Sequence, residues 1–238
     1  MSMQNKVVLI TGATGEFGPN VARAFATAGA RLALTGRKAE AAAGLAKELG
    51  LGEDRALAVA ADVTNADSVA ALVRAVLDKW ERVDVLVNIA GGYRPGKTVQ
   101  EMEDADLDFM FNLNGRSTFN VCRAVIPHML AQGSGKIVNI GAKAGLQAGR
   151  KALGYAAGKA FVLRLTEALA AAVRDQGINV NAVIPSFIDT EANRKSNPDA
   201  DYSKWVPPEQ VAAVILFLAS DEASPINGAA IPVYGRVG

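Results

Sequence analysis

Tyr155 and Lys159 are the residues of this sequence whose types and spacing most directly suggest chemistry. They lie four positions apart in a segment, Gly154–Gln176, that we expect to be a helix, so both side chains share one face. A tyrosine has an ordinary pKa of about 10, and a neighbouring ammonium stabilises the phenolate and lowers that pKa. The pair could therefore act as a proton donor and the cation that tunes it. A surface pair without chemistry is the alternative interpretation.

Few other side chains of the chain could carry acid–base or nucleophilic chemistry. His128 is the only histidine and Cys122 the only cysteine, which leaves no intrachain disulfide and no Ser-His-Asp or Cys-His mechanism unless His128 itself serves. Both lie in one expected helix, Leu107–Leu130, and we interpret both as packing residues. No cysteine–histidine cluster has the spacing of a zinc site, so no metal is expected.

A glycine-rich turn, Thr11–Gly18, follows the first expected strand and opens directly onto a helix. Its glycines Gly12, Gly15 and Gly18 would let backbone amides approach a diphosphate closely, and the helix N-terminus adds a partial positive charge. Its place after the first strand of an alternating chain predicts a dinucleotide-binding loop rather than an ordinary strand–helix turn.

The ends of the second and third expected strands bear on the choice of cofactor. No acidic residue stands in Gly36-Arg37-Lys38 to bind a ribose 2′-hydroxyl, whereas Arg37 could pair with a 2′-phosphate. Asp62, followed by Val63, could accept a hydrogen bond from the adenine amine or cap the next helix. These residues favour NADP(H), with NAD(H) possible. A solvated surface arginine is the alternative for Arg37.

The composition is that of a globular chain of 238 residues, 50% hydrophobic and 21% charged, with a formal net charge of +1. This length predicts a single domain, residues 1–238, that needs no disulfide or metal for stability. A near-neutral chain without runs of like charge is not expected to bind nucleic acid. The polar start and the short apolar runs predict no signal peptide and no membrane span, and hence a cytoplasmic protein.

Apolar runs alternate with helical patterns along the chain. Strands are expected at Val7–Thr11, Arg31–Thr35, Ala56–Ala60, Val83–Asn88, Lys136–Ile140, Ile178–Ile184 and Ala230–Val233, and helices at Val21–Ala30, Ala39–Leu49, Ala66–Trp80, Leu107–Leu130, Gly154–Gln176 and Pro208–Ser220. The alternation predicts an α/β protein with a doubly wound Rossmann fold, whose parallel sheet of about seven strands carries helices on both faces. Ligands then bind beyond the carboxyl ends of the strands, where the irregular stretch Asp189–Val206 is expected to cover a substrate.

Taken in order, the motifs resemble those of the short-chain dehydrogenase/reductase family over nearly the whole chain. They are the glycine-rich loop, Asp62, Asn88-Ile89-Ala90-Gly91, Asn112, Tyr155-x-x-x-Lys159, Asn181-Ala182-Val183-Ile184-Pro185 and Asn227-Gly228-Ala229-Ala230-Ile231-Pro232-Val233. The resemblance implies that Tyr155 transfers the substrate proton, Lys159 binds the nicotinamide ribose and Asn112 holds a water relay. Cofactor contacts are then expected from Gly12, Thr14, Gly15, Phe17, Gly18, Arg37, Asp62, Val63, Asn88, Ala90, Gly91, Pro185, Ile188 and Thr190 together with Tyr155 and Lys159. By the same resemblance, a homodimer or homotetramer acting on a small molecule is expected.

Four positions depart from the family pattern. The usual catalytic serine, thirteen residues before the tyrosine, is Ala142; Glu16 stands where the middle glycine is expected; Ile89 replaces an asparagine and Ser186 a glycine. Loss of the serine matters most, because its hydroxyl polarises a carbonyl oxygen and removal of one such donor costs on the order of a hundredfold in rate. An ordinary ketone reductase is not expected to lack it.

One branch of the family, the dihydropteridine reductases, resembles the chain at these places. The shared features are the glycine spacing of the first loop, Ala90-Gly91-Gly92-Tyr93, Gly141-Ala142-Lys143-Ala144 and most of the loop Thr190–Trp205. A loop match of this length is specific, because loops vary most. The likeness implies a conjugated imine substrate whose delocalised charge needs no single oxyanion donor. Tyr93 would stack on its ring, with Ala142 and Lys143 beside it.

Three functions follow from these observations. The first is NAD(P)H-dependent hydride transfer to a planar conjugated imine or quinonoid substrate such as quinonoid dihydropterin. The second is a carbonyl or alcohol oxidoreductase of the 3-oxoacyl thioester reductase type, with Asn112 or a water in place of the serine. The third is a catalytically weak cofactor-binding protein, which the loss of the serine favours and the retained Tyr155–Lys159 pair opposes.

Overall fold

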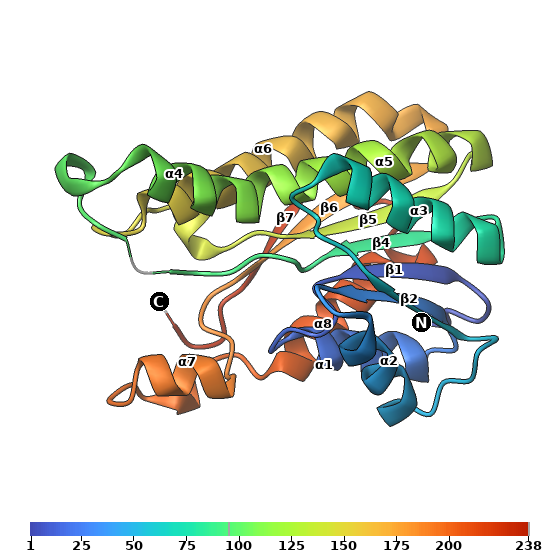
Figure 1. The fold of residues 1–238 in the computed structure, drawn as a ribbon, viewed down its shortest axis with the longest axis horizontal. Coiled ribbons are helices and arrows are strands. Elements are labelled where there is room, and N and C mark those ends of the chain that lie inside the picture. The colour runs from blue at the N-terminus through green and yellow to red at the C-terminus, as the bar shows by residue number, and fades with distance from the viewer. Residues whose placement is uncertain (95, 238) are drawn as a thin grey trace.

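One seven-stranded parallel sheet forms the centre of the computed structural model, which describes residues 1–94 and 96–237 (Figure 1). The strands are β1 (Val7–Thr11), β2 (Arg31–Gly36), β3 (Ala56–Ala60), β4 (Val85–Asn88), β5 (Gly135–Ile140), β6 (Ile178–Pro185) and β7 (Ala230–Val233). Their order is β3-β2-β1-β4-β5-β6-β7, and each neighbouring pair is parallel. The predicted doubly wound α/β fold is confirmed.

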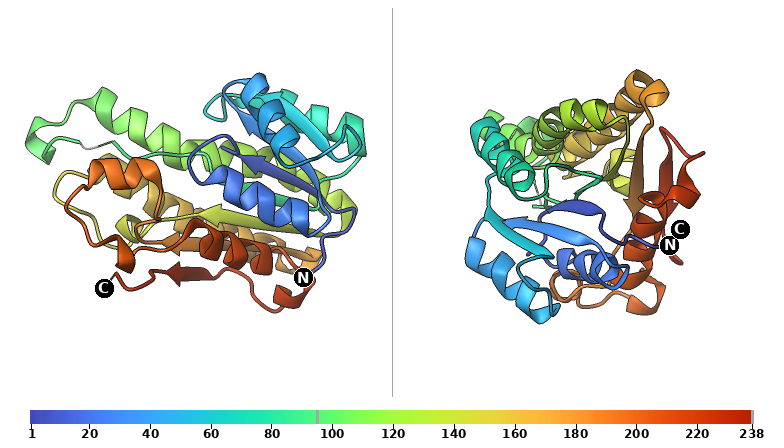
Figure 2. Two further views of the ribbon diagram at one scale, coloured as in Figure 1. Left: turned by 90° about the horizontal axis from the view of Figure 1, so that it is seen from below. Right: turned by 90° about the vertical axis from the view of Figure 1, so that its right-hand side faces the viewer.

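Helices cover both faces of this sheet. They are α1 (Gly18–Thr27), α2 (Ala39–Glu48), α3 (Ala66–Trp80), α4 (Asp104–Phe111), α5 (Ser117–Gln132), α6 (Leu153–Val173), α7 (Glu191–Ser196) and α8 (Pro208–Leu218). Helices α3, α5 and α6 lie over one face and α1, α2 and α8 over the other (Figure 1, Figure 2). All five residues of β1 are buried, because a strand covered on both faces has no polar side. Among the described residues, no helix is both long and apolar enough to cross a membrane.

Most expected elements lie within a few residues of their predicted bounds, and the exceptions concern the site. The expected helix Leu107–Leu130 is interrupted by a π-helical turn, Asn112–Arg116, which separates α4 from α5. The stretch Asp189–Val206 is not wholly irregular, since it contains α7 and a short 3-10 turn at Tyr202–Lys204. Both departures shape the edge of the sheet at which ligands are expected.

The lone cysteine and the lone histidine lie on α5 in different surroundings. Cys122 is buried and packs in the core as predicted, and burial raises the pKa of its thiol to about 12. His128 is exposed, which corrects the prediction that it packs. The buried stripe of α5 passes through Val125 and Met129, and His128 lies beside that stripe rather than within it.

Candidate active site

The carboxyl ends of the parallel strands bring together most of the residues that the sequence singles out. Loops after β1, β4, β5 and β6 start from the same edge of the sheet, and β1 lies beside β4, where the strand order changes direction. The segments leading to α4 and α7 extend beyond this edge in both views (Figure 1, Figure 2). A ligand bound here would lie in the crevice between the two halves of the sheet.

The glycine-rich loop after β1 leaves its backbone open to a ligand. Gly12 has a φ of +67°, and a Cβ there would lie 2.8 Å from the backbone N and Cα of Ala90, in the loop after β4. Within the described residues no side chain caps α1, but its first turn offers no free amide. The Gly18 and Asn20 amides donate to carbonyl oxygens of the preceding turn (both 3.2 Å), and Pro19 has no N–H. An anion would therefore be bound by loop amides and favoured by the positive end of the helix dipole. Thr14 and Gly15 lie in the same loop, whereas the Phe17 side chain is buried in the core and leaves only its backbone for a ligand.

Arg37 and Asp62 follow β2 and β3 and are exposed. The Asp62 carboxylate accepts hydrogen bonds from the hydroxyl and the amide of Thr64 (2.6 and 2.9 Å). These bonds, with a smaller effect of the Arg37 charge, hold the pKa of Asp62 below its usual range. The Asn120 amide donates to the carbonyl oxygens of Val63 and Thr64 (3.2 and 3.1 Å). Asp62 is thus an ordered turn residue, and Arg37 extends from the neighbouring strand toward solvent.

Tyr155 and Lys159 lie one turn apart at the start of α6, as their spacing predicts. Lys159 Nζ donates to the carbonyl oxygen of Ile140 (2.7 Å) and lies 5.9 Å from the centre of the Tyr155 ring. Burial lowers the pKa of Lys159 to about 8. Burial, with a smaller contribution from Tyr93, raises the pKa of Tyr155 to about 12. The expected lowering of the tyrosine pKa is therefore not found, because lost hydration of the phenolate outweighs the ammonium.

The asparagine of this cluster is Asn114, which corrects the prediction of Asn112. The Asn112 side chain turns to Arg116, whose Nε donates to its Oδ1 (3.1 Å) on the exposed side of the π-helical turn. Asn114 is buried; its Nδ2 donates to the carbonyl oxygens of Gly92 and Met110 (both 3.0 Å), and its Oδ1 accepts from the Gly92 amide (3.1 Å). Asn114 therefore joins α4 and the π-helical turn to the loop after β4.

The helical period contains the signal that distinguishes the two asparagines. Met110, Thr118 and Val125 are buried at helical spacing, and Asn114 continues this stripe whereas Asn112 does not. A Cβ added to Gly91 would lie 2.8 Å from Asn114 Oδ1 and 3.5 Å from Lys159 Nζ. Gly91, Asn114 and Lys159 therefore lie close together in the site.

Asn88, expected to contact the cofactor, is 3% exposed and its side chain faces the sheet interior. Its Nδ2 donates to Asn139 Oδ1 (2.9 Å) and to Cys122 Sγ (3.3 Å), and its Oδ1 accepts from the Thr11 hydroxyl (3.5 Å). The Thr11 hydroxyl in turn accepts from the Ala90 amide (3.3 Å). The side chain of Asn88 thus positions the loop after β4, and the contact of Asn88 with a cofactor stays a prediction.

Tyr93 lies beside Tyr155, and Ala142 lies close in sequence to Ile140, whose carbonyl oxygen binds Lys159. Ala142 is buried two residues beyond Ile140 and presents a methyl group where the family pattern has a hydroxyl. Tyr93 is 58% exposed, and its ring meets that of Tyr155 edge-on with centroids 5.2 Å apart. Lys143 lies over the ring of Tyr234, 5.3 Å from its centre, instead of extending freely toward a substrate.

The segment after β6 lies along the same edge. Pro185 ends β6, and Ile188 forms an isolated parallel bridge with Val206. The Thr190 hydroxyl accepts a hydrogen bond from the Asn193 amide (3.3 Å) and caps α7. Thr190 therefore has a structural role, and its contact with a cofactor stays a prediction.

Comparison with known proteins decides the family. The family model for short chain dehydrogenases matches residues 6–201. The chain belongs to the short-chain dehydrogenase/reductase family. It is 37% identical to a D-threitol dehydrogenase of Mycolicibacterium smegmatis, over 98% of this chain and 93% of that protein. It is 35% identical to a 3-oxoacyl-(acyl-carrier-protein) reductase of Thermotoga maritima, over 99% and 98%. A solved short-chain type dehydrogenase/reductase from Mycobacterium ulcerans superposes with a TM-score of 0.93 at 28% identity, covering 99% of this chain and 90% of that one.

As a short-chain dehydrogenase, the protein is an NAD(P)-dependent oxidoreductase, and its residues fit such a cofactor. The cradle that a Cβ at Gly12 would fill, the N-terminus of α1 and the buried ammonium of Lys159 lie along one edge of the sheet. In the part of the chain that the structure describes, no group of three or more His, Cys, Asp and Glu residues could hold a metal ion.

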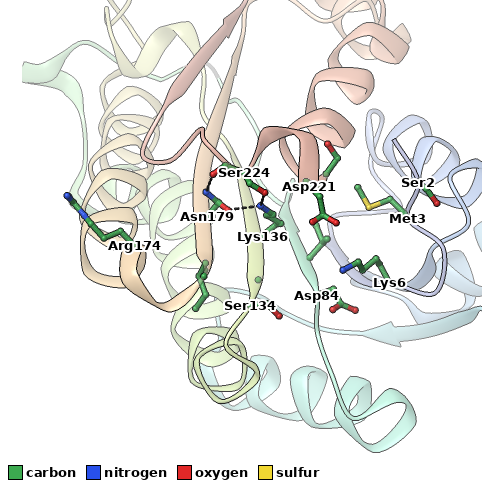
Figure 3. A pocket seen from close by; sticks show the side chains of 16 residues that line it. Ser2, Met3, Lys6, Asp84, Ser134, Lys136, Arg174, Asn179, Asp221 and Ser224 are labelled. Atoms are coloured by element: carbon green, nitrogen blue, oxygen red, sulfur yellow. Dashed lines mark hydrogen bonds between the residues drawn. The ribbon is translucent and has the colours of Figure 1, made fainter.

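Two cavities of this dehydrogenase lie at opposite edges of the sheet. One of about 170 Å³ is bordered by Tyr155 and by side chains of α4. Another of about 320 Å³ lies at the amino ends of β4, β5 and β6, where Lys136 Nζ donates to Asn179 Oδ1 and Ser224 Oγ (2.6 and 2.9 Å; Figure 3). Because ligands of this fold bind at the carboxyl ends, the smaller of these two cavities, which Tyr155 borders, is the candidate substrate cavity.

Proposed function

We propose that this short-chain dehydrogenase transfers hydride from NAD(P)H to a planar conjugated imine or quinonoid substrate, such as a quinonoid dihydropterin. The observation that carries the proposal is the buried methyl group of Ala142, two residues beyond Ile140, whose carbonyl oxygen binds Lys159. A carbonyl developing negative charge on one oxygen gains most from a fixed hydroxyl there. A conjugated ring spreads the charge over several atoms and depends less on such a donor.

The bound dinucleotide would supply the hydride, and the remaining chemistry belongs to residues of this chain. The free amides of the glycine-rich loop, with the positive end of the α1 dipole, would hold the diphosphate, and Lys159 would bind the nicotinamide ribose. Tyr155 is protonated at neutral pH, since its pKa is raised to about 12, and can donate that proton to a ring nitrogen. The exposed ring of Tyr93 offers a surface on which a flat heterocycle can pack.

The experiment that tests this function follows the oxidation of NADPH and NADH with chemically generated quinonoid dihydropterin and, separately, with an acetoacetyl thioester. We expect turnover of the dihydropterin, and loss of most of it in Tyr155→Phe. Ala142→Ser should raise thioester reduction by about tenfold or more and leave dihydropterin reduction nearly unchanged. Turnover of the thioester alone by the unaltered protein would overturn the proposal.

A carbonyl or alcohol oxidoreductase is the second candidate, favoured by relatives that are named as a 3-oxoacyl-(acyl-carrier-protein) reductase and a D-threitol dehydrogenase. In that case a water bound near Asn114 would take the place of the serine hydroxyl. Binding of NADPH without turnover of either substrate would instead indicate a cofactor-binding protein with little catalysis.

We also propose a preference for NADPH, which Arg37 would confer. Its guanidinium is exposed at the end of β2, where a 2′-phosphate would pair with it. Arg37→Ala should raise the KM for NADPH by about tenfold, since a hydrogen bond to a charged group contributes about 1.5–3 kcal/mol, and leave the KM for NADH nearly unchanged. Arg74→Ala, an exposed arginine of α3, is the matched control. An equal effect of Arg37→Ala on both cofactors would exclude this role.

A further inference from the structure

The cavity of about 170 Å³ beside the proton donor has a charge pattern that hydride transfer does not require. Three cationic side chains line it, Arg94, Lys97 and Lys151, together with one carboxylate, Asp106. Lys97 is neutralised locally, because its Nζ lies 2.6 Å from Glu103 and 3.3 Å from Asp106. Within residues 1–94 and 96–237, neither Arg94 nor Lys151 has a carboxylate at ion-pair distance. Two cationic residues without an ion-pair partner in the described part of the chain therefore border this cavity.

Local contacts hold both cations at the cavity. The Arg94 guanidinium lies over the ring of Phe109, 4.3 Å from its centre, which orients the group and leaves its N–H edge available. The carbonyl oxygen of Lys151 accepts from the Gly96 amide (2.9 Å), so the segment before α6 is joined to the loop after β4. The two cations thus belong to one structural unit with Tyr155.

Glu101 does not line the cavity, but its negative charge interacts with the ammonium of Lys151. Its carboxylate accepts hydrogen bonds from the amide and the hydroxyl of Thr98. These bonds, and more weakly the charges of Lys151 and Lys97, lower the pKa of Glu101. The Glu101 carboxylate stays ionised and attracts Lys151, but among the described residues it lies beyond ion-pair distance and so does not occupy the ammonium.

The rest of the lining is apolar. Its apolar side chains include Met102, Phe109 and the buried Met110. Such walls favour an unsubstituted hydrocarbon or aromatic surface, and thioethers adapt readily to its shape. The cavity therefore combines an apolar body with two cations that border the same space as the Tyr155 side chain.

We infer that the substrate of this enzyme carries a carboxylate, which Arg94 and Lys151 bind while the apolar part of the substrate packs on Met102 and Phe109. This inference rests on the proposed function only in that Tyr155 marks the reacting end of the substrate. A guanidinium and an ammonium at the edge of an apolar cavity suit a carboxylate, because partial desolvation strengthens each charge-assisted hydrogen bond. Arg94 and Lys151 are then specificity-determining residues.

The test measures binding and does not depend on turnover. The dissociation constants of 2-naphthoate and of its neutral isostere 2-naphthamide are determined by calorimetry on the NADPH-bound enzyme. We expect the carboxylate to bind about tenfold tighter or more, and the double variant Arg94→Gln/Lys151→Gln to abolish this difference. The charge-retaining variants Arg94→Lys and Lys151→Arg should keep it, as should the distant control Arg74→Gln. Equal affinities in the unaltered protein, or a preference that survives in the double variant, would overturn the inference.

A second measurement separates this inference from the proposed function. A naphthoquinone carboxylate and its methyl ester are compared as substrates of the same variants by steady-state kinetics. We expect the carboxylate to have a lower KM than the ester at similar kcat, and this difference to disappear in the double variant. That result supports the binding role of Arg94 and Lys151. If no quinone or dihydropterin is reduced, the proposed function fails. The naphthoate measurement then still shows whether Arg94 and Lys151 bind a carboxylate. If both quinones are reduced with equal KM, the cavity inference fails alone.

Discussion

Tyr155 and Lys159 titrate in opposite directions from their ordinary values, and both shifts are caused by burial. Tyr155, with a pKa of about 12, keeps the proton that a reduction needs, whereas Lys159, with a pKa of about 8, loses its charge just above neutrality. A cation is lost above its pKa, so we expect kcat to fall as the pH rises through about 8, when the ammonium that stabilises the emerging phenolate disappears. The measurement is kcat at saturating substrate and cofactor from about pH 6 to about pH 10.

Lys159→Arg provides the control, because a guanidinium stays charged over this range. Its residual activity should lack the fall near pH 8, and an unchanged profile would assign the fall to another group.

The lowered pKa of Lys159 also affects the stability of the fold. Since the folded state holds the Lys159 proton less tightly than the ordinary pKa of 10.5, the free energy of unfolding should rise with pH between about 8 and 10.5.

Asn114 and Asn112 differ by two positions in sequence and form a matched pair for mutation. Asn114→Ala removes three hydrogen bonds and leaves buried groups of Gly92 and Met110 without their partner, at a cost of about 1–3 kcal/mol each where water cannot replace it. We expect a clear loss of thermal stability and of kcat. Asn112→Ala loses one exposed contact with Arg116 and should behave nearly like the unaltered protein. Thermal denaturation and steady-state rates measure both effects. Larger losses in Asn112→Ala than in Asn114→Ala would contradict the assignment of Asn114 to the site.

At the scale of elements, the segment Phe187–Val206 is held together mainly by its own aromatic contacts. The Trp205 ring stacks on Phe187 with centroids 5.2 Å apart and meets Tyr202 edge-on at 4.8 Å. The Arg194–Asp189 ion pair joins the beginning of this segment to α7. Because the unit is internally packed at the edge of the site, we expect it to move as one body over a bound substrate.

Trp205→Ala should loosen this unit without unfolding the sheet. The expected results are a several-fold higher KM for substrate, a smaller change in kcat, and faster hydrogen exchange confined to the segment Phe187–Val206. Trp80→Phe, a change on α3 away from the site, is the control and should alter neither KM nor exchange there. Uniformly faster exchange over the whole sheet in Trp205→Ala would mean that Trp205 belongs to the global core.

For the whole molecule, the decisive feature is the crevice where the loops after β1 and β4 touch. Gly12 and Gly50 have nearly equal φ values, +67° and +66°, but only at Gly12 would a Cβ meet backbone, 2.8 Å from Ala90. Alanine at either position costs about 1–2 kcal/mol of backbone strain. Gly12→Ala should in addition separate the two loops and weaken NADPH binding by tenfold or more, about 1.4 kcal/mol. Equal NADPH affinities of the two variants, measured by calorimetry, would show that the crevice tolerates a methyl group.

Local patterns in the sequence were sufficient for the elements and for the order of the motifs. Short, mainly apolar runs such as Val7–Thr11 that end at glycines are typical of strands buried on both faces, and helical spacing alone places Tyr155 and Lys159 on one face. The positive φ of Gly12 likewise reflects local backbone sterics, whereas its contact with Ala90 comes from a distant loop. These properties depend on residues close in sequence, and the structure agrees with them.

Contacts between distant segments decided the rest. The π-helical turn between α4 and α5, which selects Asn114, depends on how these helices pack against α6 and the loop after β4. Asn88 is turned inward because Thr11, Cys122 and Asn139 meet it from three other elements. The pKa values of Tyr155 and Lys159 reflect desolvation, which depends on everything packed around them and cannot be obtained from spacing. The sequence alone thus determined which groups are present and on which elements, and the tertiary structure decided which of them face the ligand and in which charge state.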